Sequence, residues 1–301
     1  QMYGLCQDIP KVRDSHEKEY FDDLIAHPFL EDERIALSFQ AKLHLWRIYT
    51  MYYYATDQEE KELGAYMELL KLMDSSKDYA QEFPYDYVEI YARILSLKRE
   101  STDEEFAEIL LSLRDFPSRI KKSRRNVNVK AQSEAIRLEF ERLLYLGRFE
   151  EASEKVEETQ LFIQKNKTFF TTEEYIIFHF LMIYAGVGAR RYKEVLPMTN
   201  EIINETDSKI SPDHQSFIRI LNLMIHYELK NYTYLKYAAD AALRLYQRRK
   251  RLKTSFKVLF QLFKKLAKLE GQSASEMISY IKRAKSDLTI AFKDPYEESF
   301  L

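Results

Sequence analysis

The stretch Leu143-Leu144-Tyr145-Leu146-Gly147-Arg148-Phe149-Glu150-Glu151-Ala152 decides the fold, because it has the pattern of a turn between two antiparallel helices. A glycine suits the left-handed position that ends a helix. The order of a small or polar residue, an aromatic and a small apolar residue returns at Tyr192 and at Tyr232. The three aromatic positions stand 43 and then 40 residues apart, a step typical of stacked helix hairpins.

Helix-period patterns on both sides of this turn pair into about six hairpins. Their second helices are expected to start near residues 58, 103, 149, 192, 232 and 273, at steps of 40 to 46 residues. The first strong helix is expected over roughly 31–55, and one helix is expected over 149–165. The sequence therefore predicts an all-α fold, a right-handed α-solenoid of about six stacked antiparallel helix hairpins.

Composition agrees with a folded helical protein. The 301 residues include only 6 Gly and 7 Pro, so few positions have the special backbone conformations that sheets and phosphate loops need. Hydrophobic residues make up 46% and charged residues 31%, enough to fill an interior and to cover a surface. The single cysteine, Cys6, forms no internal disulfide, which favours a reducing compartment and a cytoplasmic location.

Three segments are expected along the chain: a lead-in over residues 1–30, the helical-repeat solenoid over 31–293, and a tail over 294–301. The first residue is Gln1 rather than Met, and both outer segments are expected to be truncated parts of a longer protein. No membrane span is expected, because the longest apolar run, Ile176 to Ala189, is 14 residues long and contains His179.

The run from Gly147 to Ala152 resembles the turn and second helix of a tetratricopeptide repeat. The preceding helix departs from that family, since Glu139-Phe140 stands where Leu-Gly is usual and Ile136 replaces a tryptophan. The steps of 40 to 46 residues also exceed the family's 34. The resemblance therefore implies degenerate or expanded repeats.

A closer likeness is to an uncharacterised family of bacterial tetratricopeptide-like proteins, and it covers roughly residues 30–298. It is carried by the run from Arg219 to Leu229, by Arg248-Arg249-Lys250-Arg251-Leu252 and by Asp294-Pro295-Tyr296-Glu297. Members continue into a Trp-containing helix that is missing here, which also favours truncation. The resemblance implies an architecture and no particular activity.

Catalytic and cofactor patterns find little support. Gly186-Val187-Gly188 lacks the third glycine of a dinucleotide fingerprint, so helix packing is the preferred interpretation. The six histidines are scattered without a metal-ligand spacing, and His179 and His226 are interpreted as core residues. Acidic pairs such as Glu150-Glu151 lie at helix starts, where carboxylates favour the helix dipole. We therefore expect no enzyme activity, no catalytic residue, no cofactor and no metal.

Charge distribution is the main functional signal. Residues 230–293 contain 16 Lys and Arg against 4 Asp and Glu, a net charge of +12, while the other residues have 30 against 44. The basic segment is suited to an acidic peptide, a nucleic-acid backbone, or the chain's own acidic part in an oligomer. The overall charge of −2 argues against nucleic acid.

The leading hypothesis is a non-enzymatic scaffold that binds a protein or peptide on the concave face of the array. The alternative is binding of nucleic acid or another polyanion through residues 230–293. Candidate partner-binding residues are Arg219, Tyr227 and Lys230 near one groove, and Arg248, Arg249 and Arg251 as an anion-facing patch. The sequence does not specify the partner or the oligomeric state.

Overall fold

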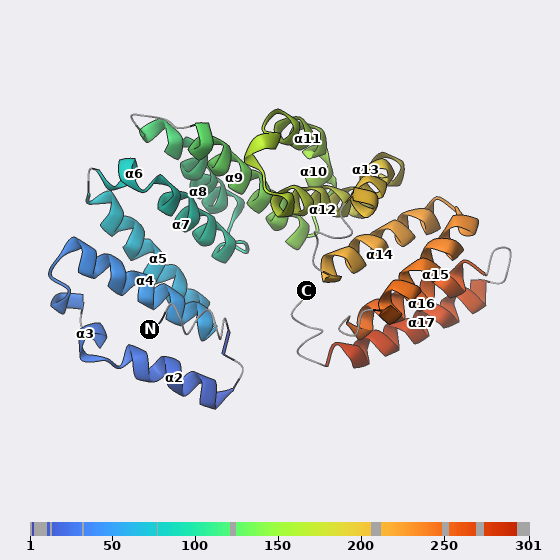
Figure 1. The fold of residues 1–301 in the computed structure, drawn as a ribbon, viewed down its shortest axis with the longest axis horizontal. Coiled ribbons are helices and arrows are strands. Elements are labelled where there is room, and N and C mark those ends of the chain that lie inside the picture. Colours follow the sequence, from blue (N-terminus) through green and yellow to red (C-terminus); the bar gives the residue numbers. More distant parts are fainter. Residues whose placement is uncertain are drawn as a thin grey trace. The chain divides into compact units, whose positions relative to one another are not determined.

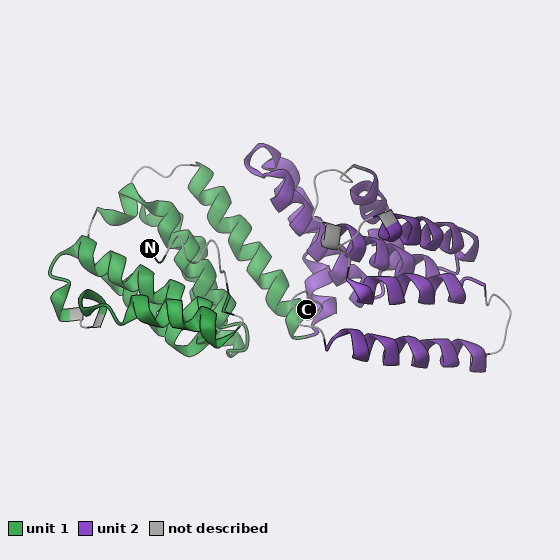
Figure 2. Cartoon of the chain, turned by 60° about the horizontal axis from the view of Figure 1, so that its bottom comes forward, with its two compact units in different colours: residues 1–146 green, residues 147–301 purple. Residues whose placement is uncertain are grey.

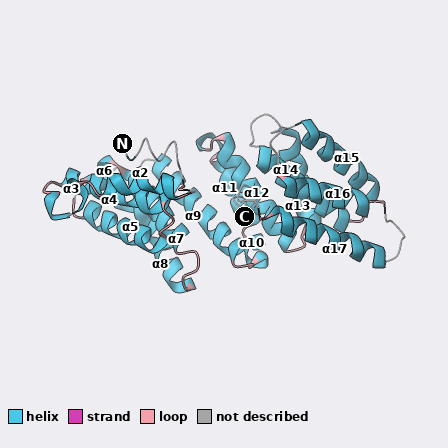
Figure 3. Ribbon diagram, turned by 90° about the horizontal axis from the view of Figure 1, so that it is seen from below, coloured by secondary structure: helices cyan, strands magenta, loops and turns pink. Residues whose placement is uncertain are grey.

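The computed structural model describes residues 2, 11–12, 14–31, 33–76, 78–120, 125–205, 212–248, 253–268 and 274–293. Every regular element within these residues is a helix, and they contain no strand (Figure 3). The all-α prediction is therefore confirmed for this part of the chain. The chain divides into two compact units, residues 1–146 and residues 147–301 (Figure 2).

The first unit runs from α2 to α9 (Figure 1). Its helices are α2 (Ser15–Ile25), α3 (Pro28–Glu31), η1 (Glu33–Ile35), α4 (Phe39–Ala55), α5 (Glu59–Asp74), α6 (Tyr79–Glu82), α7 (Pro84–Leu97), α8 (Asp103–Asp115), η2 (Phe116–Arg119) and α9 (Arg125–Tyr145). Helix α4 packs on α5, α5 on α7, and α7 on both α8 and α9. Their shared core includes Leu69, Leu95 and Leu113, each at most 2% exposed. Helix α2 adds Phe21, which is fully buried against α4.

The second unit runs from α10 to α17. Its helices are α10 (Phe149–Glu154), α11 (Val156–Lys165), η3 (Lys167–Phe169), α12 (Thr172–Gly188), α13 (Tyr192–Glu205), α14 (Pro212–Glu228), α15 (Tyr232–Arg248), α16 (Thr254–Leu266) and α17 (Ala274–Ala291). Helices α12 to α17 pack in series, each against the next. Leu235, Ala239 and Phe260 lie in the core between α14, α15 and α16.

Four inter-helix turns share one backbone geometry. Asp57, Gly147, Arg190 and Lys230 all have left-handed backbones, with φ between 58° and 71°, and the next helix begins two residues later in each case. At three of them the following N–H donates back to a carbonyl five residues earlier, the bond that closes a helix C-terminus. These bonds are Gln58 to Tyr53 (2.9 Å), Arg191 to Gly186 (2.8 Å) and Asn231 to His226 (2.8 Å).

The second helices of the hairpins begin at residues 59, 103, 149, 192, 232 and 274, within one residue of the expected starts. The first strong helix begins at Phe39 instead of near residue 31, because the Ser38 hydroxyl accepts from the Ala41 N–H and caps it there. The helix expected over 149–165 is divided at Lys155 into α10 and α11. The right-handed solenoid and the segment boundaries at residues 30 and 293 stay predictions.

The two glycines of α12 are explained by close helix packing. A Cβ on Gly186 would lie 2.2 Å from Val195 Cγ1 of α13, and one on Gly188 would lie 2.1 Å from the Phe149 ring of α10. Such distances leave no room for a side chain. The interpretation of Gly186-Val187-Gly188 as a packing feature therefore agrees with its surroundings in the second unit.

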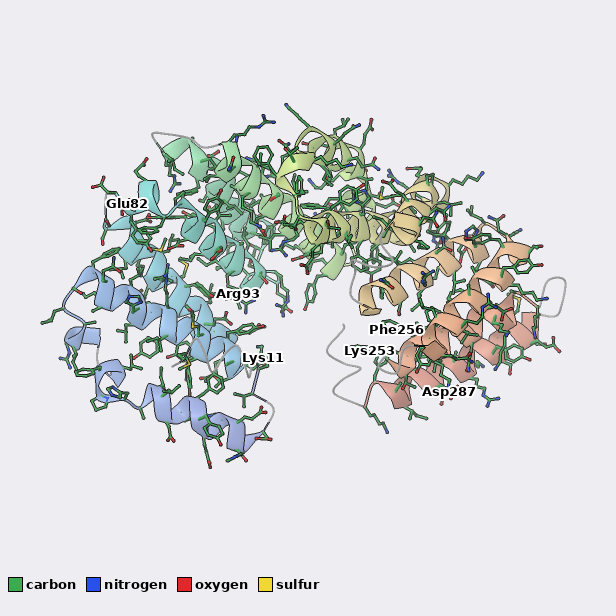
Figure 4. All side chains as sticks on the ribbon, viewed as in Figure 1. Lys11, Glu82, Arg93, Lys253, Phe256 and Asp287 are labelled. Atoms are coloured by element: carbon green, nitrogen blue, oxygen red, sulfur yellow. The ribbon has the colours of Figure 1, made fainter. Side chains whose placement is uncertain are left out.

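An ion pair lies inside the first unit. Glu62 of α5 is 1% exposed and accepts from Arg93 Nε at 2.7 Å and from Arg93 Nη2 at 3.0 Å. Arg93 also lies 4.9 Å from the centre of the Tyr54 ring, and the Lys11 ammonium lies 4.3 Å from it. Figure 4 labels Lys11 and Arg93 in this unit. Burial raises the pKa of nearby Tyr66, and the charge of Glu62 adds to the increase. This pair joins α5 to α7.

Candidate functional site

The candidate site is a cleft in the second unit, between α11, η3, α12 and α13, with a volume of about 570 Å³. Helix α11 contributes Glu157, Gln160, Leu161, Ile163 and Gln164, and η3 contributes Lys167. Helix α12 contributes Tyr175 and His179, and α13 contributes Glu201. The cleft therefore lies wholly within residues 157–201 and within one compact unit.

Helix α11 presents one polar face to the cleft because of its helical period. Positions 157, 160, 161 and 164 fall on one side of the helix, while Thr159 and Ile163 are buried. Leu161 is 60% exposed and is the accessible apolar side chain of the lining. Amide and carboxylate side chains thus surround one accessible apolar side chain.

The turn from α11 to α12 is held by aromatic packing. Phe170 meets Phe162 of α11 and Phe178 of α12 edge to face, with ring centres 6.0 Å and 5.5 Å apart. Asn166 is buried, and its side-chain Nδ2 donates to the Phe162 carbonyl at 2.9 Å. These contacts fix the position of Lys167 at the end of α11.

Helix α12 begins with a capping box that sets its register. The Thr171 hydroxyl accepts from the Glu174 N–H, and the Glu174 side chain accepts from the Thr171 N–H. Tyr175 and His179 follow one turn apart on the same face of the helix. Both side chains are therefore positioned by rigid backbone.

Hydrogen bonds orient the polar groups of α12 and α13. The Tyr175 hydroxyl donates to Glu201 Oε1 at 2.9 Å. His179 Nδ1 lies 2.8 Å from the Tyr175 carbonyl oxygen, and because a carbonyl only accepts, Nδ1 carries the proton. In the neutral imidazole, Nε2 is then the acceptor. The two rings lie 4.0 Å apart, and His179 is 7% exposed.

The lining of the cleft has more acceptor than donor character. The lining contains two carboxylates, those of Glu157 and Glu201, and one ammonium, that of Lys167. Gln160 and Gln164 supply amides that both donate and accept. Within the described residues there is no group of three His, Cys, Asp or Glu side chains suited to hold a metal ion. The arrangement is suited to hydrogen-bonded recognition of a donor-rich ligand.

The sequence-predicted residues lie elsewhere in the second unit. Arg219 is half-buried on α14. Tyr227, also on α14, packs with its ring centre 6.3 Å from that of Phe263, and burial raises the pKa of its hydroxyl. Lys230 is exposed in the left-handed turn before α15. Arg248 is the last residue of α15, and Arg249 and Arg251 lie outside the described residues.

Sequence reasoning missed the residues that line the cleft. One signal was available, since Thr171-x-x-Glu174 predicts a helix start and places Tyr175 and His179 one turn apart. The expected helix is divided at Lys155, and this division makes α11 a separate helix beside the cleft. No sequence signal predicts the division, because lysine is a good helix former.

Comparison with models of protein families, with curated proteins and with solved structures found no match to this chain. The resemblance to tetratricopeptide-like proteins therefore stays a prediction. No helix among the described residues is both long and apolar enough to cross a bilayer.

Proposed function

We propose that this chain is a non-enzymatic scaffold that binds a peptide segment of a partner protein in the cleft of α11, α12 and α13. The observation that carries the proposal is the cleft itself, about 570 Å³ with polar side chains from four elements around an exposed leucine. Ligand sites commonly have volumes of this order, with a few placed polar groups. A cytoplasmic location is part of the proposal and rests on the use of one cysteine.

The spacing of the glutamines supports an extended peptide as the ligand. Gln160 and Gln164 are four residues apart on α11, which separates them by about 6 Å along the helix axis. Alternate residues of an extended chain repeat at about 6.6 Å. Each glutamine amide can donate to a peptide carbonyl and accept from a peptide N–H. The two side chains are therefore spaced to bind successive outward peptide groups.

The exposed Leu161 supports the same ligand class. It stands between the two glutamines in sequence and is the most exposed apolar side chain of the lining. An accessible leucine beside hydrogen-bonding groups gives an apolar anchor for one ligand side chain. Peptide recognition in general combines backbone hydrogen bonds with such anchors.

The four equal turns support a common hairpin unit. Left-handed residues at 57, 147, 190 and 230 each precede a helix by two residues. We include in the proposal that these hairpins form one tetratricopeptide-like series, the right-handed solenoid expected from the sequence. Small-angle scattering of the whole chain tests the proposed single series of hairpins. A profile that fits a spherical particle of 36.0 kDa would contradict this series.

Selection of random peptides displayed on phage against the full chain tests the binding proposal. Enriched peptides are expected to bind in solution and to lose about tenfold or more in affinity for Leu161→Asp, which adds a charge to the apolar anchor. Glu158→Gln is the matched control, since Glu158 is exposed on α11 and lies outside the cleft. Equal affinity for the unmodified chain and Leu161→Asp would reject the cleft as the peptide site.

A second candidate function is supported by the outer face of α15. Tyr234 and Tyr237 are 48% and 70% exposed, and Arg244 follows two turns later on the same side of the helix. Exposed aromatic and cationic side chains together bind single-stranded nucleic acid, by stacking on bases and by contact with phosphates. These residues lie in the basic segment 230–293.

Fluorescence anisotropy with labelled single-stranded RNA and DNA of about 20 nucleotides tests the second candidate. If it holds, affinity falls steeply between about 50 and about 200 mM salt, and Tyr237→Ala weakens binding about tenfold. Tyr20→Ala, at an exposed tyrosine of α2, serves as the control. Absence of binding at the lowest salt concentration would reject this function.

A further inference from the structure

We infer that the cleft of the second unit selects a peptide with a basic side chain, arginine in preference to lysine. The inference rests on the proposed peptide-binding function and adds the chemical class of the ligand. It starts from the two carboxylates of the lining, Glu157 on α11 and Glu201 on α13, which come from different helices. A ligand bound in the cleft therefore lies among residues that include both carboxylates.

Glu201 is oriented before any ligand arrives. Its Oε1 atom accepts from the Tyr175 hydroxyl at 2.9 Å, which holds the carboxylate in one direction. A carboxylate has about four lone-pair sites, so this bond leaves capacity for further donors. Preorganisation of this kind reduces the entropy lost when the ligand binds.

The guanidinium group matches these acceptors better than an ammonium does. It is planar, always charged and presents five N–H donors in a fixed fork, which suits carboxylates. The Tyr175 ring adds an aromatic face in the lining on which a guanidinium can stack. Leu161 gives apolar surface for the three methylene groups of the arginine stem. The carboxylates of the lining therefore match the charge and the N–H donors of an arginine side chain, and Leu161 matches its apolar stem.

An acidic ligand has no such match. It would bring a carboxylate toward Glu157 and Glu201, and only Lys167 supplies a compensating cation among the lining residues. Like charges in a partly desolvated cleft repel, and this repulsion discriminates against the wrong ligand. The acidic partner considered for residues 230–293 concerns a different surface of the chain.

Substitution of Lys167 tests the inference by the direction in which the binding affinity changes. Its ammonium opposes a basic ligand, so Lys167→Gln is expected to tighten binding by about two- to fivefold. Glu201→Gln removes one of the two carboxylates and is expected to weaken binding about tenfold. Glu194→Gln is the matched control, because Glu194 is an exposed glutamate of α13 outside the cleft. A structural role of Glu201 alone would not make the effect depend on ligand charge.

The experiment uses peptides of about 12 residues taken from the phage selection, with binding to the full chain measured by calorimetry. Each arginine of the peptide is replaced in turn by citrulline, which keeps the shape and removes the charge. At one position of the peptide we expect citrulline to lower the binding affinity about tenfold. Lysine at the same position is expected to lower the affinity less. When the same peptides bind the Glu201→Gln variant, replacement of this arginine by citrulline is expected to lower the affinity less than it does with the unmodified chain. Such a difference identifies the arginine and Glu201 as an interacting pair.

The outcomes separate the two proposals. If the peptides need Leu161 but tolerate citrulline throughout, or if Lys167→Gln weakens binding, the basic-ligand inference is wrong and the peptide site stands. If the peptides bind Leu161→Asp as tightly as the unmodified chain, both are wrong. Free arginine is added as a competitor, and displacement at concentrations close to those of the peptide would overturn the assignment to a peptide.

Discussion

At the scale of single residues, Arg142 of α9 links three segments of the first unit. Its buried guanidinium donates to Asp103 Oδ1 at 2.5 Å, to the Ser101 carbonyl at 2.7 Å and to the Arg99 carbonyl at 3.2 Å. The same group lies 4.6 Å from the centre of the Phe106 ring. The carbonyls of Arg99 and Ser101, in the turn between α7 and α8, accept from this side chain, whereas the turns at 57, 147, 190 and 230 use a left-handed residue.

Arg142→Ala is expected to lower the free energy of unfolding by about 2–4 kcal/mol, because it removes the donor to two carbonyls and the buried charge partner of Asp103. Urea unfolding followed by circular dichroism measures the change. Lys71→Ala is the control, since Lys71 pairs with Glu68 on the surface of α5 and exposed pairs contribute under about 1 kcal/mol. Similar losses for the two variants would refute the linking role of Arg142.

His226 of α14 predicts a dependence of stability on pH. Asn231 Nδ2 lies 3.2 Å from His226 Nδ1, so Nδ1 accepts and the neutral ring carries its proton on Nε2. Nε2 is buried and has no hydrogen-bond partner among the described residues, and burial lowers the pKa of His226 below its usual 6.5. The unfolded chain therefore takes up a proton first as the pH falls.

The stability that His226 contributes is complete above about pH 6.5 and is lost as the pH falls below that value. We expect the free energy of unfolding of the unmodified chain to fall more between pH 7 and pH 5 than that of His226→Gln. His44→Gln, at an exposed histidine of α4, gives the baseline for removal of one imidazole. A steeper decline in His226→Gln than in the unmodified chain would reverse the predicted sign.

At the scale of elements, the turns were the most predictable feature. A glycine or polar residue before an aromatic one marked the turns at 147, 190 and 230, and all three have left-handed backbones. The start of α4 was less predictable, because Ile35 and Leu37 continue an apolar stripe although both are exposed. Burial of an apolar residue depends on its neighbours in space, which the periodicity of one segment does not specify.

The cleft as a whole could not be predicted for a related reason, although the capping box at Thr171 indicated the placement of Tyr175 and His179. Its polar side chains belong to α11, η3, α12 and α13. Those of α11 alone match an exposed face of a helix, and His179 alone matches a core residue. The division between α10 and α11 and the packing of Phe170 help to bring these faces together. Candidate residues such as Lys230 were chosen for charge and aromatic character, and those properties recur over the whole surface.

Two glycine substitutions are expected to have opposite effects on stability. Gly64→Ala lies in the exposed middle of α5, where a Cβ would lie within 4 Å of no atom in the described part of the chain, and alanine raises helix stability by about 0.5–1 kcal/mol. Gly147→Ala also meets no atom, but its φ of 71° is strained for alanine and should lower stability by about 1 kcal/mol. Chemical unfolding of both variants measures the difference. A rise in stability for both would show that the turn at 147 tolerates a side chain without strain, and a fall for both would contradict the expected gain at Gly64.

At the scale of the whole molecule, each compact unit has a core of its own. Leu95 and Leu113 are fully buried in residues 1–146, and Leu235 and Phe260 are at most 1% exposed in residues 147–301. Helical arrays derive stability from contacts between neighbouring hairpins and need no central core. Units of this size, 146 and 155 residues, are within the range of domains that fold independently.

Chains cut between Leu146 and Gly147 are therefore expected to fold as separate fragments, because the division falls in a turn and each part has a hydrophobic core of its own. Each fragment should show a helical circular-dichroism spectrum and one cooperative urea transition, with a slope about half that of the intact chain. The fragment 147–301 should also retain the peptides selected for the cleft, since all the lining residues lie within it. A fragment that unfolds without cooperativity, or that binds a hydrophobic dye strongly, would mean that its core depends on the other half of the chain.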